Sequence, residues 1–293
     1  MKKIVNLLVL VSAELAAFVC AAGNVVLRSQ TAICEIAPED GARIVSWRVN
    51  GRELLWNPST PAPKDGKWRH GGVPLVWPWV ADEWPADVEK SPHGVAWKHP
   101  FKVESRRTSE ISDEITMSFS AYALRAEYTV TLSDRLSFRF KTKNTGDKPR
   151  RYAMSLHPYF RLQERDRTVI KGFDALRYRD MRAGFVTNGV WKGDVKVVSW
   201  LDHEFYRGTA PMKAEFNDGD CRITVSSADS AAYVVWNPGD QWPVEGTEMY
   251  GGLEKGAWRH ILSVEPSSAD LKDAVPLRPG EERTLTAEFV CRE

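Results

Sequence analysis

Two histidines that open turn-like motifs and one glutamate at the end of an apolar segment could perform acid and base chemistry. His93 begins the motif His-Gly-Val-Ala, and His157 begins the motif His-Pro-Tyr-Phe. Glu265 ends the segment Leu-Ser-Val-Glu and precedes a proline. Desolvation at such a place would raise the pKa of its carboxyl toward the range useful for a general base. The alternative for each histidine is a structural role in its turn.

Asp202 is the second acidic candidate, in the segment Leu-Asp-His-Glu-Phe, although this pattern fits a solvated strand end equally well. Four histidines, at positions 70, 93, 157 and 203, could in principle bind a metal, but they lack the close spacing typical of zinc ligands. We therefore expect no metal. The chain also lacks a nucleophile elbow, a Walker loop, a dinucleotide fingerprint and an H-E-x-x-H pair.

The segments around His70 and His93 are dense in glycine, proline and tryptophan. Residues 70–79 read His-Gly-Gly-Val-Pro-Leu-Val-Trp-Pro-Trp, and residues 92–97 read Pro-His-Gly-Val-Ala-Trp. Glycine and proline fix unusual backbone turns, so these segments predict a rigid pair of loops. Tryptophan there either seals the edge of a core or offers a flat apolar face suited to the C–H groups of a sugar ring.

Strand-like segments separated by turn residues dominate from Val25 onward, and helical periodicity over more than ten residues is nearly absent. This pattern predicts one all-β domain over residues 23–293, built as a large antiparallel β-sandwich. The predicted strands are Asn24–Ala37, Arg43–Val49, Phe101–Ser105, Glu114–Ala123, Ala126–Leu132, Arg135–Asn144, Tyr152–Leu156, Val195–Trp200, Lys213–Phe216, Cys221–Ser226, Ala232–Asn237, Ile261–Pro266 and Glu282–Val290.

Residues 1–22 resemble a secretory signal peptide, with Lys2 and Lys3 before an apolar run and small residues near Ala21. We expect an exported protein, periplasmic or secreted. Removal of residues 1–21, which include Glu14, brings the net charge from +1 to 0, which gives no electrostatic case for nucleic acid. No later segment approaches the length of a membrane-spanning helix.

Three cysteines, Cys34, Cys221 and Cys291, remain after such cleavage. They can form at most one disulfide, with one thiol left over, and their wide spacing excludes a compact zinc motif. The sequence leaves the pairing open.

Taken in order, these motifs resemble the glucose-6-phosphate 1-epimerase branch of the aldose 1-epimerase family, from about Val25 to Phe289. Five motifs in family order are a specific signal, although no single one would be. They are His-Gly-Gly-Val-Pro from His70 with Trp-Pro-Trp from Trp77, His-Gly-Val-Ala from His93, Leu-His-Pro-Tyr-Phe from Leu156, Val-Trp-Asn-Pro from Val235, and Val264-Glu265.

The resemblance implies a β-sandwich of the galactose-mutarotase type and a sugar substrate whose α and β anomers are interconverted. It implies that His157 is the general acid, Glu265 the general base, His93 a second active-site histidine, and Asp202 the residue that holds sugar hydroxyls. No cofactor is expected, because the substrate carries its own electrophile. We expect a monomer or a weak dimer.

The chain departs from this branch at two positions. The branch usually has arginine before Gly-Gly and after His-Gly-x-Ala, where this chain has His70 and Trp97. Both are candidate substrate-binding residues, but neither offers the fork that suits phosphate. Arg69 and Lys98 lie one residue away. We therefore expect an aldose 1-epimerase for a free hexose or related sugar. The alternatives are a hexose 6-phosphate epimerase and a carbohydrate-binding protein without turnover.

Overall fold

The computed structural model describes residues 23–59, 67–163, 165–183, 186–198, 200–242, 250–268 and 276–292. The expected signal peptide, residues 1–22, lies outside the described residues. Strands make up nearly all of the regular structure, and the described helices are short 3₁₀ turns. The prediction of an all-β antiparallel sandwich is confirmed. No helix in these ranges is long and apolar enough to cross a membrane.

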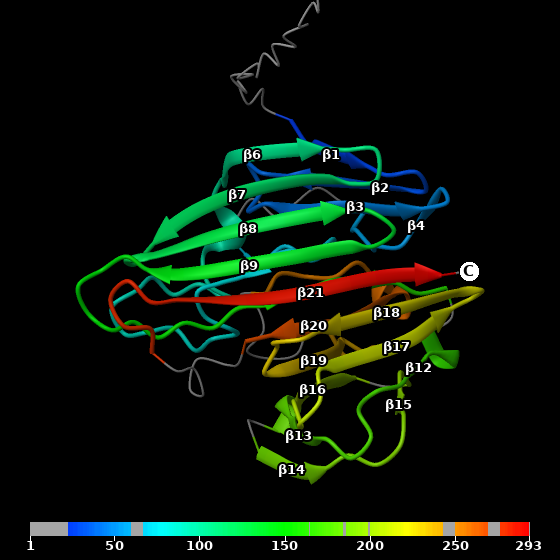
Figure 1. Cartoon of the computed structure of the whole chain (residues 1–293). Helices are drawn as coiled ribbons and strands as arrows, with labels where there is room; N and C mark the ends of the chain where they lie inside the picture. The colour runs from blue at the N-terminus through cyan, green and yellow to red at the C-terminus, as the bar shows by residue number, and fades with distance from the viewer. Residues whose placement is uncertain are drawn as a thin grey trace, which may run out of the picture.

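One layer is a seven-stranded antiparallel sheet in the order β17-β18-β21-β9-β8-β7-β6, which crosses the front of Figure 1. Buried and partly exposed residues alternate along its central strands, as expected for strands with one face in a core. The strands are β6 (Lys102–Thr108), β7 (Asp113–Ala121), β8 (Leu124–Leu132), β9 (Leu136–Asn144), β17 (Met212–Asp218), β18 (Cys221–Ser227) and β21 (Glu282–Arg292).

The second layer is an eight-stranded sheet in the order β14-β13-β16-β19-β20-β10-β5, with β11 also paired to β20. Every residue of β20 is buried, so this strand is covered on both faces. The strands are β5 (Leu75–Val76), β10 (Ser155–Leu156), β11 (Phe160–Arg161), β13 (Arg177–Asp180), β14 (Val186–Val190), β16 (Leu201–Tyr206), β19 (Ala232–Asn237) and β20 (Ile261–Ser267).

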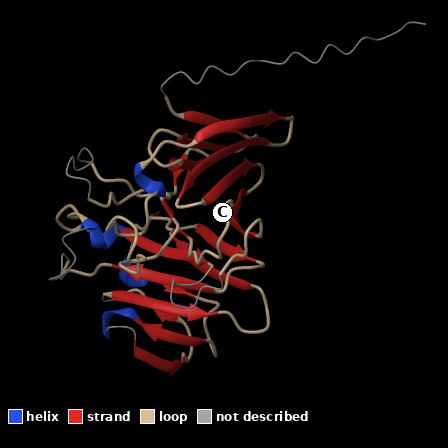
Figure 2. Ribbon diagram, turned by 90° about the vertical axis from the view of Figure 1, so that its left-hand side faces the viewer, coloured by secondary structure: helices blue, strands red, loops and turns tan. Residues whose placement is uncertain are grey.

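A four-stranded sheet in the order β1-β2-β3-β4, a two-stranded sheet of β12 and β15, and the 3₁₀ turns complete the described fold. Figure 2 shows the short helices and many of the long loops on one side of the stacked strands. The elements are β1 (Val25–Arg28), β2 (Ala32–Ala37), β3 (Arg43–Val49), β4 (Arg52–Glu53), β12 (Val169–Ile170), β15 (Val195–Lys196), η1 (Ala96–Lys98), η2 (Arg165–Arg167), η3 (Met181–Ala183) and η5 (Ala257–His260).

Aromatic side chains join the two large sheets. Phe289 of β21 packs 4.6 Å from Phe138 of β9 in its own sheet and 5.3 Å from Phe160 of β11 in the other. Edge-to-face contacts of this kind add to the free energy gained from burying the rings. The core therefore lies between the two layers, as a sandwich requires.

Several segments differ from their predictions. Regular strand covers only β10 in the predicted Tyr152–Leu156 and only β15 in the predicted Val195–Trp200. The segment Asn24–Ala37 forms a hairpin, because the chain turns at Ser29, whose amide donates to the carbonyl of Ala32. The segment around Asp202, which resembled a solvated strand end, is the central strand β16. It pairs with β13 on one side and β19 on the other.

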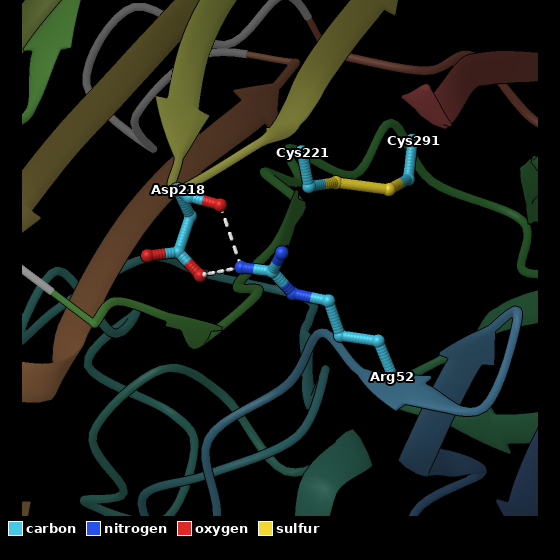
Figure 3. Close-up of a disulfide and its surroundings, with 4 residues drawn as sticks. All are labelled: Arg52, Asp218, Cys221 and Cys291. Carbon is cyan, nitrogen blue, oxygen red and sulfur yellow. Dashed lines mark hydrogen bonds and ion pairs between the residues drawn. A yellow bond between two sulfur atoms is a disulfide. The ribbon is translucent and has the colours of Figure 1, made fainter. Parts of the chain in front are cut away.

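Cys221 of β18 and Cys291 of β21 form a disulfide, and Cys34 is a buried free thiol. The two strands are hydrogen-bonded neighbours, which brings the cysteines together across 70 residues of sequence. Beside the disulfide, Arg52 of β4 donates to the carbonyl and the carboxylate of Asp218 at 2.6 and 2.5 Å (Figure 3). This contact ties the four-stranded sheet to the end of β17.

Candidate active site

A cavity of about 370 Å³ collects the candidate residues from distant parts of the chain. Its volume lies in the range of small-molecule sites. Five of the six candidates line it, namely His70, His93, His157, Asp202 and Glu265. The sixth, Trp97, does not.

His157 and Glu265 meet because their strands are paired. Ser155 of β10 faces Ser267 of β20 in an antiparallel register, and continuing that register past the end of β10 places His157 opposite Glu265. Nε2 of His157 lies 3.4 Å from Oε1 of Glu265, and both side chains are buried. The hydroxyl of Ser263 lies 3.3 Å from Nδ1 of the histidine.

Burial pushes the pKa values of this pair in opposite directions. It raises the pKa of Glu265 well above the ordinary value, and the nearby carboxylate of Asp202 adds to that effect. Burial also lowers the pKa of His157, with His93 as a further cause. Both shifts favour the neutral forms, in which Glu265 carries the proton that His157 would carry in the charged forms. An acid and a base that differ by one shared proton are what hemiacetal opening requires.

The backbone around His93 fixes its ring. His93 has φ +57°, and a Cβ on Gly94 would lie 2.0 Å from the carbonyl oxygen of Trp77, so only glycine fits there. The amide of Ala81 donates to Nδ1 of His93 at 3.2 Å. Since Nδ1 accepts, Nε2 carries the hydrogen and is a donor. Burial lowers the pKa of His93 to about 3, so the neutral ring persists over the usual pH range.

Asp202 reaches the cavity from β16, where it lies opposite Trp236 of β19. Burial and the carboxylate of Asp180 raise the pKa of Asp202 to about 7, and Arg182 partly offsets this. Arg182 itself donates to both carboxylate oxygens of Asp180, at 2.9 and 2.7 Å, and to the carbonyl of Trp200 at 2.8 Å. Asp202 is thus an acceptor that also becomes a donor near neutral pH.

Aromatic rings form much of the remaining wall. The ring of Trp68 lies 4.5 Å from that of His93 and 5.7 Å from that of His157. The hydroxyl of Tyr250 donates to Asp82 at 2.8 Å. The sequence analysis did not identify Trp68 or Tyr250 as wall residues, since both lie outside the regular strands. The further aromatic lining residues are Tyr159, Trp200, Trp236 and Trp242.

The two positions that replace the expected arginines differ in their surroundings. Trp97 lies behind Trp68, with ring centroids 5.4 Å apart, and its indole N–H donates to the carbonyls of Pro92 and Gly94. His70 lines the cavity, but its Nδ1 faces the hydroxyl of Tyr159 at 2.9 Å. Neither position presents a cation.

His203 lies apart from the cavity. Its Nδ1 is 3.6 Å from Asp180, and its ring packs against Trp191 and Phe205. Among the residues that the structure describes, no group of three or more His, Cys, Asp or Glu side chains is arranged to hold a metal.

The chain is similar to known proteins over most of its length. A protein of Cenchrus ciliaris that carries the provisional name glucose-6-phosphate 1-epimerase is 25% identical over 283 residues, which cover 88% of this chain and 82% of that protein. The crystal structure of a provisionally named mutarotase from Salmonella typhimurium superposes with a TM-score of 0.76 at 18% identity, over 92% of this chain and 90% of the other. Galactose 1-epimerase from Lactobacillus acidophilus has a TM-score of 0.70 at 14% identity, over 92% and 94%.

The model of the family described as aldose 1-epimerase matches residues 25–289. The family resemblance drawn from the motifs is therefore confirmed, together with sugar anomer interconversion as the reaction class. This chain belongs to the aldose 1-epimerase family.

Proposed function

We propose that this protein is an exported, cofactor-independent aldose 1-epimerase that acts on an unphosphorylated hexose or a related sugar. The observation that carries this proposal is the His157–Glu265 pair, 3.4 Å apart at a buried wall of an aromatic cavity. The anomeric hydroxyl and the ring oxygen of a sugar are bonded to the same carbon. Two groups this close together can therefore reach both oxygens at once.

Ring opening uses the pair as follows. Glu265 takes the proton of the anomeric hydroxyl while His157 protonates the ring oxygen, and the bond from C1 to the ring oxygen breaks to give the open-chain aldehyde. The hydroxyl donates to Glu265 and the ring oxygen accepts from His157, which favours the charged forms of both groups. Rotation about C1–C2 presents the other face of the carbonyl, and the two roles reverse on closure.

His93 and Asp202 are suited to hold the sugar. The Nε2–H of His93 is a donor to a ring or hydroxyl oxygen, and Asp202 accepts from other hydroxyls of the sugar. Aromatic faces such as that of Trp236 pack against C–H groups of the ring. These roles orient the anomeric centre over the acid and base pair.

The charges around the cavity support an unphosphorylated substrate. Arg182 is the one Arg or Lys among the lining residues that the structure describes, and Asp180 occupies its fork. The two neighbouring cations are also paired, Arg69 with Asp40 at 2.8 Å and Lys98 with Glu89 at 3.2 Å. At these three described cations, a phosphate dianion would have to displace a carboxylate partner, and it would also meet the carboxylates of the cavity wall.

Export is supported by two independent features. The N-terminal segment has the basic and apolar composition of a signal peptide. The disulfide between Cys221 and Cys291 belongs to an oxidising compartment rather than to the cytosol of most organisms. Phosphorylated hexoses are chiefly cytoplasmic, so export and a free sugar fit together.

Exchange spectroscopy by NMR on a panel of free aldoses tests the proposal. We expect purified protein to accelerate exchange between the α and β signals of at least one sugar far above the buffer rate. Binding of a sugar without faster exchange would favour the carbohydrate-binding alternative. Faster exchange for hexose 6-phosphates alone would favour the alternative that the relative from Cenchrus ciliaris suggests by its name.

A further inference from the structure

Tyr159 contacts two histidines of the cavity, His157 through its ring and His70 through its hydroxyl. The side chain is completely buried. Its ring stacks on His157 with centroids 4.6 Å apart and an interplanar angle of 8°. Its hydroxyl lies 3.0 Å from Nε1 of Trp68 and 2.9 Å from Nδ1 of His70.

The direction of these hydrogen bonds follows from the groups themselves. An indole N–H can only donate, so the hydroxyl of Tyr159 accepts from Trp68. Nδ1 of His70 is the acceptor that the hydroxyl hydrogen reaches among the described residues, so we assign Tyr159 as the donor and Nδ1 as the acceptor. The hydrogen of His70 is therefore on Nε2. Burial raises the pKa of Tyr159 far above the ordinary range, so the phenol keeps its hydrogen at any pH of interest.

The chain of contacts continues beyond His70. Burial lowers the pKa of His70 to about 4, while main-chain groups of Gly251 and Tyr250 stabilise a proton on the ring. Because Nδ1 faces Tyr159, the ring nitrogen on the side of Gly251 and Tyr250 is Nε2, which is buried and makes no full hydrogen bond to the described residues. Tyr250 in turn packs 5.1 Å from the ring of His93.

We propose that Tyr159 is the positioning residue of the site. Its ring holds His157 by stacking, and its hydroxyl sets the Nε2–H tautomer of His70, which turns that hydrogen toward the main chain at Tyr250 beside His93. His70 thus stands where an arginine was expected, but its Nδ1 accepts from Tyr159 and its Nε2 is buried, so neither nitrogen is assigned to the sugar. The effect on turnover rests on the proposed epimerase function, whereas the tautomer of His70 does not.

The test compares Tyr159→Phe with the wild type by nitrogen NMR of the histidine side chains and by anomer exchange. The His70→Asn variant serves only to assign the His70 signals. We expect wild-type His70 in the Nε2–H form. In Tyr159→Phe we expect a mixture of tautomers and a loss of about three- to tenfold in kcat, the size expected for one neutral hydrogen bond. Tyr159→Leu, which also loses the stacked ring, should lose more.

Tyr128→Phe is the matched control. Tyr128 is also completely buried, but it lies in β8 within the core, and its hydroxyl makes no hydrogen bond within the described ranges. We expect its exchange rate and the His70 signals to match the wild type. An Nδ1–H form of His70 in the wild type would overturn the proposal, as would a Tyr159→Phe exchange rate within twofold of it. If the wild type exchanged no sugar, the proposed function would fail, while the tautomer data would still decide the hydrogen-bond relay.

Discussion

The acid and base roles predict that Glu265 and His157 depend on each other. Their reacting atoms lie 3.4 Å apart in a buried site, and the reaction needs one proton to leave the sugar as another arrives. General acid or base catalysis typically contributes about 10²–10⁴-fold. We expect Glu265→Gln and His157→Asn each to lower kcat by roughly 10³-fold, or about 4 kcal/mol at 1.4 kcal/mol per decade.

The double variant should lose about the same factor rather than the product of the two, because either single change already disables the pair. The assay is anomer exchange by NMR, corrected for the spontaneous rate in buffer. Glutamine is isosteric with Glu265 and neutral, and since burial already favours the neutral carboxyl, we expect little change in the melting temperature. His260→Asn is the control, because His260 contacts the carbonyl of Leu162 and does not line the cavity. A single variant with nearly normal exchange, or losses that multiply, would refute the reasoning.

Three further predictions concern pH, the disulfide and export. The pKa of Asp202 is raised to about 7, so folding stabilises its protonated form. This contribution to the free energy of unfolding is full below about pH 4 and is lost as the pH rises toward 7. The loss amounts to about 4 kcal/mol. Thermal unfolding should therefore show the wild type losing stability relative to Asp202→Asn over this window, and parallel curves would contradict it. Replacing Cys221 and Cys291 by alanine should lower the free energy of unfolding, measured in urea, by about 2–4 kcal/mol. The anomer exchange rate should stay unchanged, since neither residue lines the cavity. A large loss of exchange would contradict this and link the disulfide to the site. Intact-mass analysis of native protein should place the N-terminus close to Ala22, and a chain that still begins at Met1 would argue against export.

The sequence predicts most of the strands because their alternation reports burial directly. Segments such as Arg43–Val49 and Ala232–Asn237 appear with the expected bounds. Strand β16 was not predicted, because its acidic and histidine residues resemble a solvated strand end. In the structure it is hydrogen-bonded to a strand on each side. The pairing of Cys221 with Cys291 could not be predicted either, because it depends on β18 lying beside β21, and the spacing of the cysteines in the sequence does not reveal that order.

The site could be predicted where a motif marks it and not where a long-range contact completes it. His157 and Glu265 each lie beside a proline at the end of an apolar segment, a pattern that can be recognised in the sequence. Trp68 and Tyr250 lie in loops, so nothing local assigns them to the cavity wall. The place of Trp97 behind Trp68 is likewise a matter of packing between loops, which no residue pattern encodes.

We propose above all that this family member acts on the free sugar, because Arg182, Arg69 and Lys98 near its cavity are paired with carboxylates. The most direct test measures kcat/KM for a free aldose and for its 6-phosphate side by side on the wild-type protein, through anomer exchange. Loss of two charge-assisted phosphate contacts, each worth about 1.5–3 kcal/mol, removes roughly two to four powers of ten of preference for the phosphate. We predict that the free aldose gives an equal or higher value. A hundredfold preference for the 6-phosphate would contradict the account and show that Arg182, Arg69 or Lys98 leaves its carboxylate partner to bind phosphate.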